Sequence, residues 1–211
     1  MPGAVYFNSY KLKKGSSIPD FLLAVKTLFT QVISRHKGYR SFALFRDGDT
    51  WADYSVWETI DDLNAFVKSA TAGEPNELAA SFYSFLNFNS CKSHHFSVER
   101  SNNSDENHFT LDSVVSFHSY KLKKGASAES FLRVADKIHT DFAPLQKGWV
   151  SSQTFFDGKT WADTQVLASK DDFEQFVKAC YSSGITRESS SLMDFNGMNG
   201  YTFSVEKSDC C

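Results

Sequence analysis

The stretch YKLKKG at residues 10–15 recurs unchanged at residues 120–125. When the chain is aligned on itself through these two copies, DGDTWAD (residues 47–53) coincides with DGKTWAD (residues 157–163). After a short deletion the match resumes, with FSVER at residues 96–100 against FSVEK at residues 203–207. Self-similarity along the length of a chain is the signature of an internal duplication. The sequence therefore predicts two copies of one structural unit.

Each copy has the pattern of a βαββαβ unit. In the first copy, residues 4–12 alternate as a strand does, and the turn at Gly15 is followed by Phe21, Val25 and Leu28 at helical spacing. The Asp-Gly pair at residues 47–48 lies between two strand-like runs, which indicates a hairpin. Acidic residues 61–62 begin a second helix, and residues 94–100 form the last strand. This order is that of a ferredoxin-like unit.

The domain organisation follows from the repeat. We predict an α+β fold in which residues 1–100 form the first ferredoxin-like unit, residues 101–112 a polar linker, and residues 113–208 the second unit. Two helices can cover only one face of a four-stranded antiparallel sheet, so the other face needs another cover. A second, similar sheet would provide it. We therefore expect the two units to form a pseudo-twofold α+β barrel within one chain.

Composition narrows the class of protein. The chain has 211 residues, a net charge of -3 and 41% hydrophobic residues, so nucleic-acid binding has no basic surface to support it. No apolar run is long enough to cross a membrane and the first residues do not resemble a signal peptide, so we expect no membrane association and a cytoplasmic location. Neither a phosphate-binding glycine loop nor a metal-binding cysteine motif is present. We expect no metal and no bound cofactor.

The alternation along the strands predicts which side chains face which way. Placing the apolar Val5 and Phe7 against the helices leaves an unusually polar set to face the inside of the barrel. The predicted inward side chains include Tyr6, Asn8, Tyr10, Trp51, Asp53 and His95 of the first copy, and His118, Tyr120, Trp161, Asp163 and Gln165 of the second. Because buried polar groups need hydrogen-bond partners, this set predicts a pocket between the sheets that binds a small molecule.

Within this set, four residues are candidates for catalysis. His118 beside Asp163 could act as a general base, and His95 and Asn8 are the other candidates. The remaining inward residues, Tyr6, Tyr10, Trp51, Asp53, Tyr120, Trp161 and Gln165, are predicted to contact the ligand. The alternative is that all these polar groups satisfy one another across the two sheets and leave no cavity.

Taken together, the unit size, the glycine turn after the first strand and the third-strand ending YSVWET (residues 54–59) before an acidic helix start resemble the dimeric α+β barrel superfamily. This group includes antibiotic-biosynthesis-type monooxygenases, heme-degrading monooxygenases and stress-responsive barrel proteins. The resemblance implies two ferredoxin-like units packed sheet against sheet. Here both would come from one chain, as an intramolecular pseudo-dimer with further homodimerisation open to it.

Asn8 carries a residue-level resemblance to the heme-degrading members, which have a catalytic asparagine at this place in the first strand. The resemblance implies that a tryptophan and a histidine on the second helix would complete such a site. Phe66 takes the tryptophan position here, and neither copy has a histidine on that helix. Heme degradation is therefore disfavoured.

Three kinds of function remain open. The resemblance and the polar pocket favour a cofactor-independent, monooxygenase-like enzyme that acts on a small aromatic or lipophilic metabolite. A non-catalytic ligand-binding protein fits the same pocket without requiring the histidine and aspartate pairs to meet. A stress-related structural or interaction protein fits if the inward polar groups satisfy one another and leave no cavity.

Overall fold

A computed structural model describes residues 3–73, 76–102 and 109–208 of the chain. Contacts divide the described residues into two compact units: residues 3–97 with 207–208, and residues 98–206. The boundary falls within one long strand, and much of the predicted linker (101–112) lies outside the described residues. The predicted sheet-to-sheet packing of the two repeats stays a prediction.

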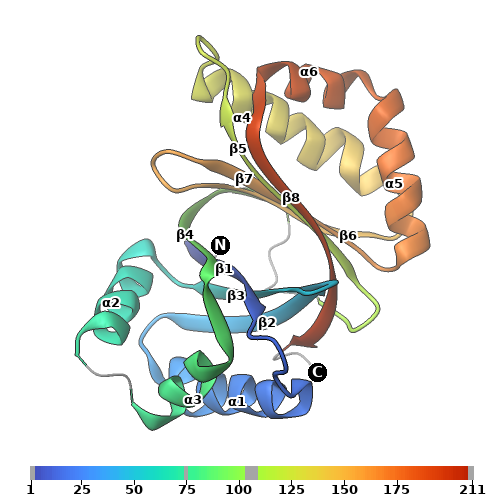
Figure 1. Cartoon of the computed structure of the whole chain (residues 1–211). Helices are drawn as coiled ribbons and strands as arrows, with labels where there is room; N and C mark the ends of the chain where they lie inside the picture. The colour runs from blue at the N-terminus through green and yellow to red at the C-terminus, as the bar shows by residue number, and fades with distance from the viewer. Residues whose placement is uncertain (1–2, 74–75, 103–108, 209–211) are drawn as a thin grey trace. The chain divides into compact units, whose positions relative to one another are not determined.

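The first repeat contains four strands and three α-helices among its described residues. They are β1 (Ala4–Leu12), α1 (Ile18–Gln31), β2 (Tyr39–Asp47), β3 (Thr50–Trp57), α2 (Ile60–Thr71), α3 (Glu77–Phe85) and β4 (Leu86–Ser101), with a 3-10 turn at Ile33–Arg35. The strands pair antiparallel in the order β4-β1-β3-β2. Helices α1 and α3 lie side by side, blue and green in Figure 1.

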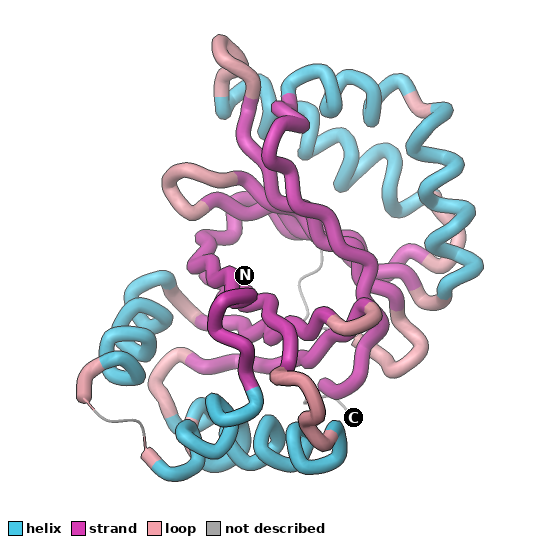
Figure 2. The backbone as a smooth tube through the Cα atoms, viewed as in Figure 1, coloured by secondary structure: helices cyan, strands magenta, loops and turns pink. Residues whose placement is uncertain are grey.

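The second repeat follows the same plan. Its elements are β5 (Val114–Leu122), α4 (Ala128–Lys137), a π-helical turn (Ile138–Phe142), a 3-10 turn (Ala143–Leu145), β6 (Trp149–Phe156), β7 (Trp161–Leu167), α5 (Lys170–Ser182), α6 (Gly184–Leu192) and β8 (Met193–Ser208). The strand order is β8-β5-β7-β6, again antiparallel. Helices α4, α5 and α6 form a layer on one side of these strands (Figures 1 and 2). The predicted α+β fold with tandem ferredoxin-like units is confirmed.

Each repeat contains a helix that the sequence pattern did not reveal. Helices α3 and α6 precede the last strand of each repeat, and that strand begins at Leu86 or Met193 rather than near His94. Asn76 caps α3 by accepting a hydrogen bond from the Ala79 amide at 2.8 Å. The segment that forms α6, GITRESSSL, has few strong helix formers and no apolar stripe, so its helix depends on its neighbours.

The start of the second helix in each repeat explains the Lys-Gly motif at residues 37–38 and 147–148. Asp62 accepts a hydrogen bond from the Thr59 hydroxyl at 2.7 Å, while its own amide donates to that hydroxyl at 3.0 Å. Gly38 has φ +77°, and a Cβ atom there would lie 2.5 Å from the Asp62 side chain. Lys37 completes the contact, with its Nζ 3.1 Å from the Asp62 carboxylate.

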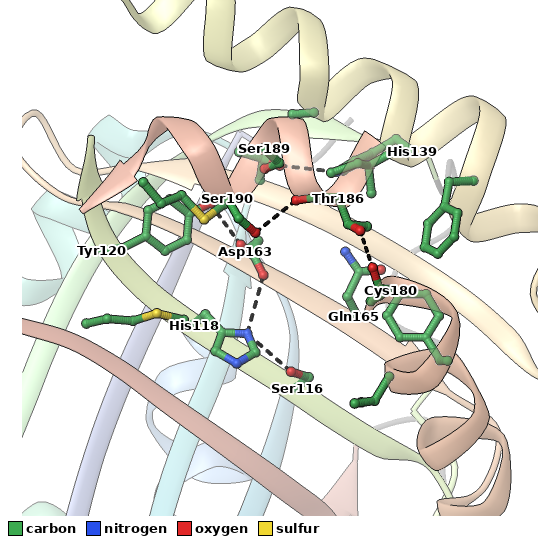
Figure 3. Close-up of a pocket in the computed structure, with 18 of the residues that line it drawn as sticks. Ser116, His118, Tyr120, His139, Asp163, Gln165, Cys180, Thr186, Ser189 and Ser190 are labelled. Atoms are coloured by element: carbon green, nitrogen blue, oxygen red, sulfur yellow. Dashed lines mark hydrogen bonds and ion pairs between the residues drawn. The ribbon is translucent and has the colours of Figure 1, made fainter. Parts of the chain in front are cut away.

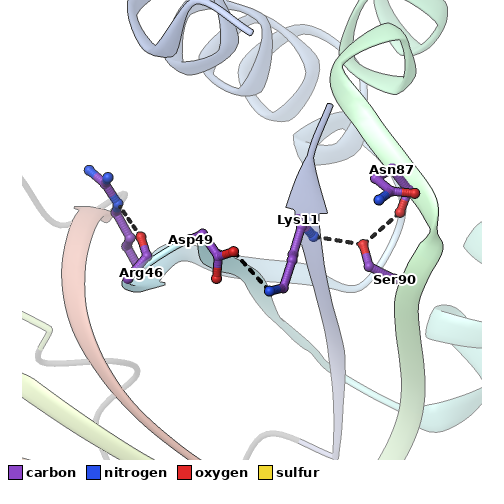
Figure 4. Close-up of polar contacts among 6 residues, drawn as sticks. Lys11, Arg46, Asp49, Asn87 and Ser90 are labelled. Atoms are coloured by element: carbon purple, nitrogen blue, oxygen red, sulfur yellow. Dashed lines mark hydrogen bonds and ion pairs between the residues drawn. The ribbon is translucent and has the colours of Figure 1, made fainter. Parts of the chain in front are cut away.

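The repeated hexapeptide is scaffolding. The Lys13 ammonium donates to the Ser84 carbonyl at the end of α3 at 2.7 Å, and Lys123 makes the equivalent bond to Ser191 at 2.9 Å. Lysines near a helix C-terminus satisfy its free carbonyls and complement its dipole. Lys11 pairs with Asp49 at 2.8 Å, and its amide donates to the side chain of Ser90 in the bulged part of β4 (Figure 4).

The predicted orientation of the strands is wrong by one face. Tyr10 packs edge-on against Phe21 of α1 and Phe82 of α3, with ring centroids 6.2 and 6.0 Å apart, so its side of β1 faces the helices. Val5 and Phe7, which were expected to face the helices, point to the other face. Both faces carry buried aromatic and aliphatic residues. Alternation fixes which residues share a face, but it does not identify the face that the helices cover.

Candidate functional site

A cavity of about 360 Å³ lies in the second repeat, between its sheet and its helices. Strands β5, β6, β7 and β8 form the floor, and residues of α4, the π-helical turn, α5 and α6 form the walls. The pocket had been expected between the two sheets; the structure instead shows one under the helices of a single repeat. The reason is the reversed orientation of the strands, which turns the polar set of β5 and β7 toward the helices.

A cluster of polar residues stands on the floor of this cavity (Figure 3). The Tyr120 hydroxyl donates to Asp163 Oδ2 at 2.8 Å, and His118 Nδ1 lies 3.6 Å from Asp163 Oδ1. Ser116 Oγ is 3.3 Å from the same His118 nitrogen. These contacts follow from strand register, because His118 and Asp163 are directly paired between β5 and β7.

The electrostatics of the cluster favour a basic imidazole. Burial lowers the pKa of His118, but the hydrogen bond and the charge of Asp163 more than offset this, so the pKa is raised above its usual value of 6.5. Burial, followed by the charge of Asp163, raises the pKa of Tyr120 well above 10, so the hydroxyl stays protonated. The His118 Nε2 atom makes no hydrogen bond to any described residue.

Room for the imidazole depends on a glycine of the neighbouring strand. Gly200 pairs with His118 across β5 and β8, and a Cβ atom at Gly200 would lie only 2.9 Å from His118 Cδ2. In the first repeat the equivalent pair is Asn8 and Ser93, whose hydroxyl donates to the Asn8 amide oxygen at 2.8 Å. The larger His118 is therefore paired with glycine, whereas the smaller Asn8 is paired with serine.

The rest of the cavity wall is mainly apolar. Rings and aliphatic side chains from the helices and from β8 line it, namely Phe131, Ile138, Phe142, Phe173, Phe176, Val177, Met193 and Met198. Tyr181 and Phe195 also line the cavity and are 82% and 55% exposed, which places them at its mouth. A pocket with apolar walls and a few convergent polar groups is typical of a small-molecule site.

In the first repeat the floor of the equivalent space, next to the sheet, is filled. Phe82 and Tyr83 of α3 take the positions of Ser189 and Ser190 of α6, and Phe82 packs on Phe21 with ring centroids 6.1 Å apart. Trp57 stands where Leu167 stands in the second repeat. These rings belong to one packed core of the first repeat. The first repeat keeps a pocket of about 330 Å³ between its helices, but no described strand residue lines it. The cavity that reaches the sheet is in the second repeat.

The structure separates the predicted site residues into two groups. His118, Tyr120, Asp163 and Gln165 line the cavity, whereas Trp161 packs behind it against Phe131, with ring centroids 4.8 Å apart. The candidates of the first repeat, namely Tyr6, Asn8, Tyr10, Trp51, Asp53 and His95, lie together in or beside the packed core of that unit. The copies of the Tyr–Asp pair therefore lie in unlike surroundings, since Tyr10 donates to Asp53 at 2.7 Å with both side chains buried.

Several lining residues were not predicted, and comparison of the repeats could have found them. Large apolar side chains of the first repeat are replaced by small or polar ones in the second: Phe29 by His139, Leu44 by Thr154, Phe82 by Ser189 and Tyr83 by Ser190. All four replacements line the cavity. Such replacements between repeats are a signal of lost packing volume.

The comparisons with known proteins agree with this architecture. Residues 5–75 match the sequence profile of the family described as antibiotic biosynthesis monooxygenase. A protein of Fusobacterium nucleatum named as a candidate monooxygenase superposes with a TM-score of 0.71 at 12% identity, covering 98% of this chain and 94% of that one. The chain therefore shares the fold of this structure, and its first repeat matches the family profile.

Two further structures are similar to this chain. A candidate monooxygenase from Lactobacillus acidophilus gives a TM-score of 0.68 at 13% identity, with 99% of this chain and 96% of that chain covered. An anthrone oxidase-like protein gives 0.66 at 12% identity, with 99% and 93% covered. At these identities the likeness concerns the fold alone. No curated sequence matches the chain.

Two further observations concern metal-binding side chains and membrane-spanning helices. Among residues 3–73, 76–102 and 109–208, no three His, Cys, Asp or Glu side chains are placed to hold a metal ion. In the same residues, none of the helices is long and apolar enough to cross a membrane.

Proposed function

We propose that the second repeat binds a flat aromatic or lipophilic metabolite and catalyses its oxygenation without a bound cofactor. The observation that supports this best is the His118–Asp163–Tyr120 cluster, which lies at the floor of a mainly apolar cavity of about 360 Å³. That volume is near the lower end of the range of about 300–1,000 Å³ for small-molecule sites. It suits a fused bicyclic or tricyclic ring system.

The cluster is arranged for proton abstraction. Neutral His118 takes a proton at Nε2 from an acidic C–H of the substrate, and Asp163 stabilises the imidazolium that forms. The substrate carbanion, delocalised over its rings, is itself the reductant of O₂. Carbon–oxygen bond formation and protonation give a hydroperoxide, R₂CH–OOH, which loses water to yield the ketone R₂C=O. One O₂ is consumed and one water is released per substrate R₂CH₂, so atoms and electrons balance.

Oxygen uptake with anthrone tests the proposal, because anthrone has an acidic CH₂ between two aromatic rings and is named in one structural neighbour. The wild-type chain should consume O₂ and form anthraquinone faster than buffer does. His118→Asn, which installs the residue of the first repeat, should reduce the rate about 100-fold or more. His36→Asn is the matched control, a histidine removed from the first repeat, and should leave the rate unchanged. Equal rates in the His118 variant and the wild type would refute the assignment of the base.

A non-catalytic binder is the second candidate. The 3.6 Å separation of His118 Nδ1 and Asp163 Oδ1 favours it, because that distance exceeds an ordinary hydrogen bond. Saturable binding of anthrone without oxygen uptake above the buffer rate would support a binding protein over an enzyme.

A further inference from the structure

The helix above the cavity changes its winding in the second repeat only. Helix α4 passes into the π-helical turn Ile138–Phe142, where the amide of Ala143 donates to the Ile138 carbonyl five residues earlier. In the first repeat α1 stays α-helical through the equivalent Phe29 and ends at Gln31. Single π-helical turns are uncommon and are frequently found at functional sites. This turn carries His139.

His139 is buried against the cavity with one ring nitrogen unused. It is 5% exposed, and its Nε2 lies 3.1 Å from the hydroxyl of Thr154 on β6. Its Nδ1 is buried and has no hydrogen-bond partner in the described part of the chain. Burial lowers the pKa of His139 to about 4, so the ring is neutral at physiological pH.

A second unused polar atom lies on the neighbouring strand. Gln165 of β7 is 9% exposed, and its Oε1 is likewise buried without a partner among the described residues. Thr154 pairs with Asp163, two positions from Gln165 on the same face of β7, so Thr154 and Gln165 are diagonal neighbours. His139 contacts Thr154, and both unused atoms therefore belong to one corner of the cavity.

The first repeat has no such corner. Phe29 stacks on Phe42 with ring centroids 3.5 Å apart, and Leu44 and Ser55 occupy the positions of Thr154 and Gln165. The Ser55 hydroxyl is used, since it accepts a hydrogen bond from the Trp57 indole at 3.0 Å. Buried polar atoms without partners are destabilising, so two of them in one cavity indicate a missing group.

We infer that His139 and Gln165 form a recognition subsite for a hydroxyl group of the substrate, an inference that rests on the proposed function. The Thr154 hydroxyl donates to His139 Nε2, His139 Nδ1–H donates to the substrate oxygen, and the substrate O–H donates to Gln165 Oε1. Every polar atom of the corner is then satisfied. A hydroxyl suits this corner because it both accepts and donates without bringing in a charge.

The register of the sheet fixes where this hydroxyl lies on the substrate. His118, Asp163 and Thr154 form one row across β5, β7 and β6. Two strand spacings separate the ends of the row, about 10 Å. A fused aromatic molecule lying across the row therefore presents its acidic carbon to His118 and its hydroxyl to His139. The substrate class is a hydroxylated polycyclic aromatic compound.

Calorimetric titration with 2-naphthol and naphthalene tests the subsite. The wild-type protein should bind 2-naphthol about 10-fold more tightly than naphthalene. In His139→Leu, and independently in Gln165→Leu, this preference should fall to within about twofold. In His118→Asn, the matched histidine variant at the other end of the row, it should persist.

Each other result has a definite meaning. A preference that persists in both leucine variants and disappears in His118→Asn overturns the subsite and leaves the aromatic pocket in place. Equal affinity of the wild type for the two compounds also overturns it, because water would then satisfy the corner as well as a hydroxyl does. Failure of both compounds to bind would overturn the proposed function and the subsite together. Circular dichroism verifies that each variant is folded.

Discussion

Asp53 is a buried carboxyl group in the filled repeat, and replacing it with asparagine should change how stability depends on pH. Asp53 is 3% exposed and accepts a hydrogen bond from Tyr10 at 2.7 Å. Burial raises its pKa to about 7, although the hydrogen bonds from Tyr10 and Asn8 oppose the shift. An unfolded aspartate has a pKa near 3.9. Between these two values the folded protein binds the proton and the unfolded chain does not.

The sign and size of the effect follow from this difference. Because the folded state binds more protons, the free energy of unfolding falls as pH rises from about 4 through about 7. The two pKa values imply a loss of about 4 kcal/mol over the whole range, of which about 2 to 3 kcal/mol falls between pH 5 and pH 8. Asp53→Asn removes the ionisation and should remove this part of the slope.

Urea unfolding at pH 5, 6, 7 and 8, followed by tryptophan fluorescence, measures the effect. The free energy of unfolding of Asp53→Asn should change less over this range than that of the wild type, by about 2 to 3 kcal/mol. Asp61→Asn on the exposed side of α2 removes the same charge without a buried site and should retain the wild-type slope. If the free energy of unfolding depends on pH equally in the wild type and Asp53→Asn, the argument that ionisation of buried Asp53 destabilises the folded protein is refuted.

Three further outcomes concern the second repeat. Gly200→Ser should displace the His118 ring, because the new Cβ atom would lie 2.9 Å from His118 Cδ2. This variant should lower kcat about 10-fold or more with little change in ligand Kd, and an unchanged kcat would contradict the argument. If His118 is the base, kcat/KM should rise with pH and level off above the raised pKa, and Asp163→Asn should move the midpoint to lower pH; a midpoint that does not move would exclude the pair. The double variant Ser189→Phe with Ser190→Tyr, which copies α3, should abolish ligand binding and raise the free energy of unfolding by about 1–3 kcal/mol, as measured by calorimetry and urea unfolding.

The sequence predicted the elements well because the duplication shows each pattern twice. The Asp-Gly turns and the acidic helix starts at Asp62 and Asp172 all lie where they were expected. Helices α3 and α6 were missed because they are short, with nine residues each, and helices of that length depend on their caps and on packing.

The site was predicted in part. Strand alternation identified both His118 and Asp163 as residues of one face, and the strand register pairs them. The location of the cavity was not, because it depends on which face of the sheet the helices cover and on the volume of side chains from α6. Alternation carries no information about either property. His139 was missed because its exposure to the cavity depends on a π-helical turn, which has no sequence signature of its own.

The duplication has a consequence for what such a protein can become. In a homodimer one gene segment encodes both halves, so any substitution that hollows one half hollows the other as well. Here Phe82 and Ser189 are separate positions, and each repeat can change without the other. The chain can thus give up packing in one repeat to make a cavity, while the other repeat keeps its aromatic core intact.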